Sequence, residues 1–154
     1  MKIKLSIVMI FCFLNLFSQT KETKLNWLTD AQEAVALSNK QQKPILLFFT
    51  GSDWCGWCIK LQKEVFTQPE FIEWASKNVV LLELDFPRKT VQDEKIKLQN
   101  QYLQQVFGVR GYPTVFLATA TVTDGKVGFT ALGQTGYVAG GAAAWLNVVK
   151  PFIK

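Results

Sequence analysis

The chain has 154 residues and a formal net charge of +5, and 49% of its residues are hydrophobic. That is enough for one domain with its own core, without structural disulfides or metals. Basic residues are scattered among acidic ones, with no block of like charge, so neither nucleic acid nor an anionic membrane is an expected partner.

The first twenty residues have the pattern of a secretory signal. A basic start at residues 1–4 precedes an apolar run at 5–17, and residues 18–20 are small or polar, as a cleavage site requires. The run has about thirteen residues, whereas a membrane span needs about twenty. We therefore expect a signal peptide at 1–18 and a periplasmic or otherwise extracytoplasmic protein. A retained N-terminal anchor is the alternative.

Hydrophobic periodicity predicts an α/β domain over residues 27–154. Residues 44–49 form an apolar run with no polar interruption, which suits a strand in a sheet covered on both faces. In chain order we predict a helix over 27–37, the apolar strand over 44–49, a helix after Cys58, a helix through 71–75 that begins with a capping box at 67–70, a strand over 79–85, a helix over 93–105, a strand over 114–118, a hairpin strand over 127–132 after a turn at 124–125, and a final helix over 138–153.

Only three cysteines are present, and one of them, Cys12, lies in the leader. The remaining pair, Cys55 and Cys58, is not a disulfide scaffold, so these cysteines are expected to react. A zinc site would need about four ligands, but the chain has no histidine and no third mature cysteine. We expect no metal and no cofactor.

The two cysteines follow the apolar strand at the start of a predicted helix. Positions three apart on a helix lie roughly 5–6 Å from each other between Cβ atoms, close to the reach of a disulfide. Cys55 would gain from the unpaired N–H groups and positive dipole end of the helix, which favour a thiolate. Cys58 lies one turn deeper. This asymmetry predicts Cys55 as the attacking thiol and Cys58 as the resolving one.

Trp54 and Trp57 flank the pair with apolar surface, which favours docking of an extended or unfolded substrate. The alternative is that both are ordinary core residues.

The sequence W-C-G-W-C at 54–58 and the sequence G-Y-P-T at 111–114 carry a resemblance to the thioredoxin superfamily. They match its W-C-x-x-C site and its cis-proline segment, and the predicted elements follow its order. The chain is most similar to exported members, such as the C-terminal domain of the transmembrane thiol-disulfide interchange protein. The resemblance implies a thioredoxin fold, a central mixed β-sheet flanked by helices. It also implies a cis bond between Tyr112 and Pro113, beside the cysteines, where Tyr112 would offer N–H and C=O to substrate.

Two positions depart from the family. Thioredoxin has a buried carboxylate six residues before the first cysteine, and here that position is Phe49. Proton transfer would then use water or Glu64, although the helical position of Glu64 also fits a solvated face. Between the cysteines stands Trp57 where protein disulfide isomerase has a histidine that makes it more oxidising. The missing charge favours a reductase or isomerase over a strong oxidant.

The predicted function is that of an exported protein-disulfide oxidoreductase. Its partners would be disulfide-bearing exported proteins and a membrane electron donor, and we expect a monomer. The alternative is a non-catalytic thioredoxin-like binding or chaperone module that docks partners on Trp54, Trp57 and Tyr112.

Overall fold

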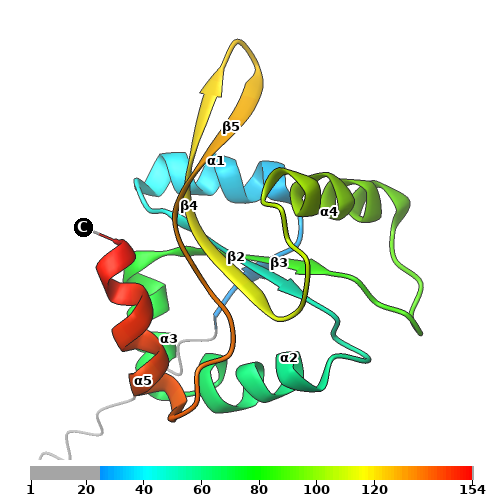
Figure 1. Ribbon diagram of the computed structural model, residues 1–154. Coiled ribbons are helices and arrows are strands. Elements are labelled where there is room, and N and C mark those ends of the chain that lie inside the picture. Colours follow the sequence, from blue (N-terminus) through cyan, green and yellow to red (C-terminus); the bar gives the residue numbers. More distant parts are fainter. Residues whose placement is uncertain (1–24, 154) are drawn as a thin grey trace, which may run out of the picture.

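The computed structural model describes residues 25–153, which fold around a five-stranded mixed sheet (Figure 1). The strand order is β1-β3-β2-β4-β5; β1 and β2 run parallel to β3, whereas β4 is antiparallel to both β2 and β5. The strands are β1 (Trp27–Leu28), β2 (Ile45–Thr50), β3 (Val80–Asp85), β4 (Thr114–Thr123) and β5 (Lys126–Thr135).

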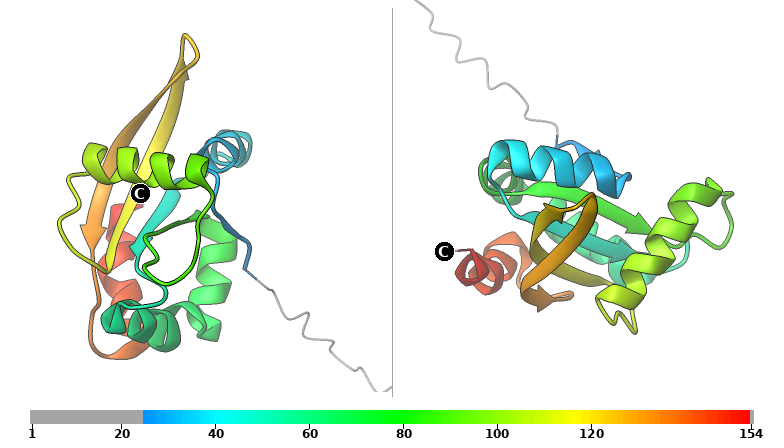
Figure 2. Two further views of the ribbon diagram at one scale, coloured as in Figure 1. Left: turned by 90° about the vertical axis from the view of Figure 1, so that its right-hand side faces the viewer. Right: turned by 90° about the horizontal axis from the view of Figure 1, so that it is seen from above.

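Helices cover both faces of this sheet (Figures 1 and 2). One face carries α1 (Ala31–Gln41) and α4 (Glu94–Val106). The other carries α2 (Gly56–Leu61), which continues into the π-helical turn η1 (Gln62–Phe66), together with α3 (Pro69–Asn78) and α5 (Gly141–Val149). This is the α/β, thioredoxin-type arrangement that the resemblance implied.

The central strand β2 is buried along its whole length, as its unbroken apolar sequence predicted. Because successive side chains of a strand point to opposite faces, β2 contributes to two separate cores. Leu46 and Phe48 pack on the α2, α3 and α5 side, whereas Ile45, Leu47 and Phe49 pack on the α1 and α4 side. The end of β2 therefore leads directly into α2 with a rigid sheet beneath it.

The N-terminal part of the domain differs from the prediction. Trp27 and Leu28 form a short edge strand and not the start of a helix, and α1 begins only at Ala31. Asp30 caps it by accepting hydrogen bonds from the backbone N–H groups of Gln32 and Glu33, which forces an extended conformation at residue 30. Two residues of strand are too short a pattern for periodicity to reveal.

One further helix boundary and one helix cap were predicted wrongly. The last helix does not begin at 138 but at Gly141, because Gly140 and Gly141 have positive φ angles of 106° and 76° that interrupt any earlier helical turn. It is followed after Val149 by a 3-10 turn, η2 (Lys150–Phe152). The capping box before α3 is also absent: Gln68 is the N-cap, and its side chain makes no capping bond.

The hairpin β4–β5 was predicted in the right place but too short. The turn lies at Asp124 and Gly125, both with positive φ, which fits a tight two-residue hairpin turn. Beyond Ala118, the last β4 residue that pairs with β2, the two strands extend past the rest of the sheet (Figure 1).

The predicted signal peptide at 1–18 and Cys12 lie outside the described residues. Between residues 25 and 153, no helix has the length and apolar character needed to cross a membrane. The same residues hold no group of three or more side chains arranged to bind a metal ion.

Candidate active site

The cysteine pair lies where β2 gives way to α2. Cys55 is the N-cap of α2 and Cys58 is in its first turn, with their Cα atoms 5.2 Å apart, and the two are joined in a disulfide. Cys55 is 7% exposed and Cys58 is 1% exposed. The spacing argument is therefore confirmed, and the difference in exposure has the predicted direction.

The backbone around Cys55 holds its sulfur against the start of the helix. The N–H of Cys55 donates to the carbonyl of Gly51 over 2.8 Å, while the N–H of Cys58 donates to Sγ of Cys55 over 3.2 Å. A sulfur that accepts a backbone N–H at a helix start is stabilised as an anion once the disulfide opens.

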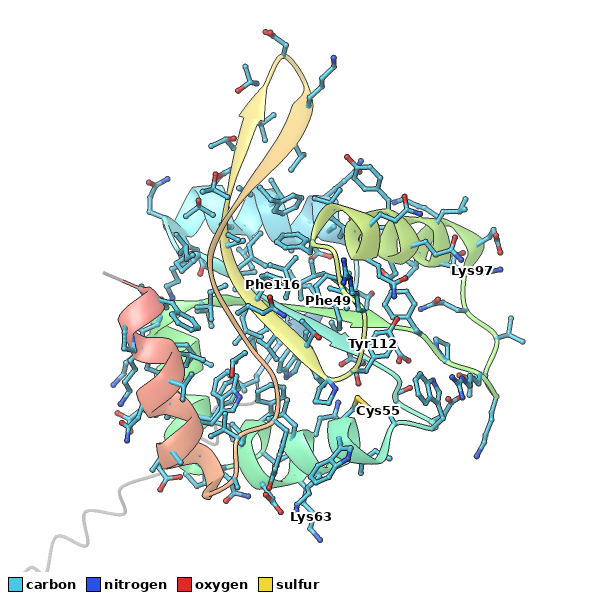
Figure 3. All side chains as sticks on the ribbon, viewed as in Figure 1. Phe49, Cys55, Lys63, Lys97, Tyr112 and Phe116 are labelled. Carbon is cyan, nitrogen blue, oxygen red and sulfur yellow. A yellow bond between two sulfur atoms is a disulfide. The ribbon has the colours of Figure 1, made fainter. Side chains whose placement is uncertain are left out.

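The second motif lies beside the first. The peptide bond between Tyr112 and Pro113 is cis, as the resemblance implied, and Figure 3 shows Tyr112 just across from Cys55. The Tyr112 hydroxyl accepts a hydrogen bond from Nε2 of Gln104 over 2.7 Å. Partial burial raises the pKa of this phenol above its usual value.

Trp54 joins the active-site turn to the segment after β3. Its indole N–H donates to the carbonyl of Phe86 over 2.8 Å, and the guanidinium carbon of Arg88 lies 3.6 Å from the centre of the indole ring. The Tyr112 ring is nearly perpendicular to the same indole ring, with a centroid distance of 5.7 Å. Gly51 permits this placement, because a Cβ there would clash with the indole ring. Trp54 is thus held in position from several sides.

Asp53 is a residue that sequence reasoning missed. Its carboxylate accepts backbone N–H bonds from Arg88, Lys89 and Thr90, with distances from 2.7 to 3.2 Å. These bonds, led by the one from Arg88, hold the pKa of Asp53 below its usual value. The bonds span about thirty-five positions of sequence, so no local pattern could have revealed them. Together Asp53 and Trp54 fix the segment 86–90 beside the cysteines.

Trp57, by contrast, faces solvent. It is 58% exposed and packs against Tyr137 at a centroid distance of 5.2 Å. The ammonium group of Lys60 lies about 5 Å from the centre of each ring, at 5.1 and 5.0 Å. The core alternative for Trp57 is therefore wrong, whereas Trp54 does pack partly against the core.

Glu64 belongs to this exposed group and not to the space behind the cysteines. It accepts a hydrogen bond from the Tyr137 hydroxyl over 2.5 Å and lies 3.8 Å from the Lys60 ammonium. Both contacts are on the outer side of α2 and η1, and 37% of the Glu64 side chain is exposed.

The residue six positions before Cys55 does not face the cysteines. Phe49 points to the α4 side of the sheet, on the opposite face from Cys55 (Figure 3). Phe48, the preceding residue of β2, is on the cysteine face, and Glu83 is its register partner on β3. Burial, reinforced by the neighbouring charge of Asp85, raises the pKa of Glu83. Sequence reasoning missed this half-buried carboxylate.

Fold and site together define a protein of the thioredoxin class. Residues 31–140 match the family described as thioredoxin-like domain. The disulfide bond reductase DsbH of Chlamydia pneumoniae is 39% identical over 130 residues, which cover 84% of this chain and 74% of that protein.

Two further matches agree. A solved structure of a DsbH oxidoreductase aligns with a TM-score of 0.72 at 36% identity, covering 84% of each chain. The thiol:disulfide interchange protein DsbD of Vibrio vulnificus strain CMCP6 is 31% identical over 101 residues, which are 64% of this chain but only 16% of that longer protein. The chain belongs to the thioredoxin-like family.

Proposed function

We propose that this protein is an exported disulfide reductase in which Cys55 attacks a substrate disulfide and Cys58 resolves the mixed disulfide. The observation that carries the proposal is the buried disulfide at the start of α2, beside a cis-proline. That the protein is a thiol-disulfide oxidoreductase acting on protein disulfides agrees with the disulfide bond reductase among its relatives. Export and the direction of electron flow are the further steps of the proposal.

The roles of the two cysteines follow from their surroundings. Cys55 is the more exposed of the pair, and its sulfur receives the N–H of Cys58. A stabilised thiolate that substrate can reach is the better nucleophile. Cys58 is almost fully buried, so it meets only a sulfur already bonded to Cys55.

The substrate surface is proposed to lie along the Tyr112–Pro113 segment and Trp57. Within residues 25–153, neither the N–H nor the C=O of Tyr112 enters a hydrogen bond, so both are free for an extended peptide. Trp57, which lies between the two cysteines in the sequence, offers an exposed apolar ring. Trp54 packs against Tyr112 and supports its position.

The proposed direction is reduction or isomerisation. The loop between the cysteines contributes no charged side chain, so the reduced form lacks the extra stabilisation that characterises strong oxidants. Such a protein needs electrons from outside itself. The proposed electron donor is a membrane protein that is accessible from the extracytoplasmic side. The protein itself is proposed to act as a monomer.

Trapping of mixed disulfides tests the proposal. In Cys58→Ser, Cys55 can still attack but cannot be released, so mixed disulfides should accumulate with extracytoplasmic proteins in cells expressing the full chain. Cys55→Ser is the matched control and should trap almost nothing. If neither variant accumulates partners and the wild type does not reduce a protein disulfide, the non-catalytic binding module replaces the enzyme.

A further inference from the structure

Resolution of a mixed disulfide requires Cys58 to become a thiolate, and Cys58 is poorly placed to do so by itself. Its side chain is 1% exposed, so bulk water has almost no access to the thiol. Its neighbours in the core are apolar, and burial in such surroundings disfavours the thiolate. A proton acceptor inside the protein is needed.

Glu83 stands on the same face of the sheet as the cysteines. It is paired in register with Phe48 on β2, and its side chain points to the side of Leu81, two residues earlier on β3. Phe48, Leu81 and Cys58 belong to one core cluster. Glu83 is therefore a carboxylate at the border of the core that holds the resolving thiol.

Asp85, two residues further along β3, lies on the same face of that strand as Glu83. The core cluster on that face consists of apolar side chains, and Lys60 on α2 and Lys63 on η1 are exposed. Residues on that face of the sheet include Trp27 from β1, Phe48 and Thr50 from β2, Cys58 and Leu61 from α2, Phe71 and Ala75 from α3, and Asp85 from β3 itself.

Asp85 is already committed to other partners, since its carboxylate accepts from both the N–H and the hydroxyl of Ser52 over 2.8 and 2.6 Å. Thr50, on the same face, carries an unsatisfied polar group. Its hydroxyl is fully buried and has no hydrogen-bond partner among the described residues. Burial and the charge of Asp85 raise the pKa of Glu83 from 4.5, which makes its carboxylate a better proton acceptor.

We propose that Glu83 accepts the proton of the Cys58 thiol during resolution of the mixed disulfide. The Cys58 thiolate then attacks Sγ of Cys55, so that the Cys55–Cys58 bond forms and the bond from Cys55 to the substrate sulfur breaks. The substrate thiolate leaves and takes a proton from water. Glu83 is half-buried and releases its own proton to solvent. Overall the two cysteines lose two electrons and the substrate disulfide gains them.

This inference rests on the proposed roles of Cys55 and Cys58, and a two-phase reaction separates the two claims. Reduced wild-type protein is mixed with 5,5′-dithiobis(2-nitrobenzoate) in a stopped-flow instrument. Attack by Cys55 releases one coloured thiolate in a bimolecular phase, and attack by Cys58 releases the second in a unimolecular phase. Absence of two phases in the wild type would contradict the cysteine roles themselves, independently of Glu83.

In Glu83→Gln, the second phase should slow by about 10- to 100-fold near neutral pH, while the first phase stays unchanged. The wild-type second phase should also show an ionisation above 4.5 that the variant lacks. Glu64→Gln is the matched control and should leave the second phase unchanged, because Glu64 faces outward.

Three results would overturn the inference. The first is an unchanged second phase in Glu83→Gln. The second is a slow second phase in Glu64→Gln alone. The third is an equal slowing of both phases at every pH, which would indicate a structural role only.

Discussion

The backbone N–H of Cys58 points at Sγ of Cys55, with 3.2 Å between nitrogen and sulfur. The helix start fixes this N–H, so it stays in place when the disulfide is reduced. In the reduced protein this N–H can stabilise a thiolate on Cys55. Within the described residues, no corresponding donor reaches the sulfur of Cys58.

Reduced protein should therefore be alkylated at Cys55 much faster than at Cys58 near neutral pH. The reasons are the hydrogen bond to Sγ of Cys55 and the deeper burial of Cys58. Iodoacetamide labelling followed by peptide mass mapping gives both rates from one sample. Equal rates, or faster labelling of Cys58, would reverse the assignment of nucleophile and resolving thiol.

The reduction potential should lie roughly between −200 and −270 mV, the range from glutaredoxins to thioredoxin. Equilibration in a glutathione redox series, followed by tryptophan fluorescence, measures it. Trp57→His should shift the potential toward the roughly −180 mV of protein disulfide isomerase, because a histidine beside the thiolate favours the reduced form. A wild-type value near −120 mV would identify an oxidant instead.

Truncation of the exposed tryptophan should weaken substrate binding without slowing chemistry. In Trp57→Ala, we expect KM for an unfolded protein disulfide to rise by about 3- to 10-fold, the worth of one aromatic contact, with kcat unchanged. Ile59 on the same helix is 49% exposed, so Ile59→Ala is the matched control. An equal loss in both variants, or a loss with a small disulfide reagent, would remove Trp57 from the substrate surface.

The turn before the cysteines should tolerate no side chain at Gly51. In Gly51→Ala the new Cβ would meet the Trp54 ring, displace it from the Phe86 carbonyl and cost about 1–3 kcal/mol of unfolding free energy. Urea unfolding and tryptophan emission report the two effects. Gly56 has open space around its Cβ position and lies in α2, so Gly56→Ala should be neutral or slightly stabilising. Similar behaviour of the two variants would contradict this packing.

The half-buried carboxylate of Glu83 should lower the free energy of unfolding as the pH rises. Burial raises the pKa of Glu83 in the folded state above the unfolded value near 4.5. Below 4.5 both states hold the proton and burial costs nothing; above the folded pKa both states are ionised and the folded state bears the cost. Glu83→Gln should therefore gain stability relative to the wild type as pH rises from about 4 to about 8.

Glu73 provides a control of opposite sign. Its hydrogen bond and charge pairing with Lys77 lower its pKa, so its contribution is present above 4.5 and is lost as pH falls through the lowered value. Glu73→Gln should lose a little stability relative to the wild type over the same rise in pH. Urea titrations at each pH give both differences. A Glu83→Gln difference that does not change with pH would contradict the raised pKa.

The reactive centre was readable from the sequence because its parts are local. The cysteine spacing, the apolar strand before it and the Tyr112–Pro113 pair each depend on a few adjacent residues, and the structure places them together. The helix start at Gly141 was missed, although two adjacent glycines mark it. The apolar pattern of this helix extends to residues before 141, but the positive φ angles of Gly140 and Gly141 prevent an earlier start.

Sequence alone thus determined the redox pair, the deeper burial of Cys58 than of Cys55, and the α/β layout, since these follow from spacing and periodicity. Only the tertiary structure decided where the carboxylates lie relative to the cysteines. Asp53 holds the segment after Phe86, Glu64 faces outward to Tyr137, and Glu83 borders the core on the cysteine face. The physical reason is that the environment of a carboxylate depends on strand register and on partners distant in sequence, which no local pattern encodes.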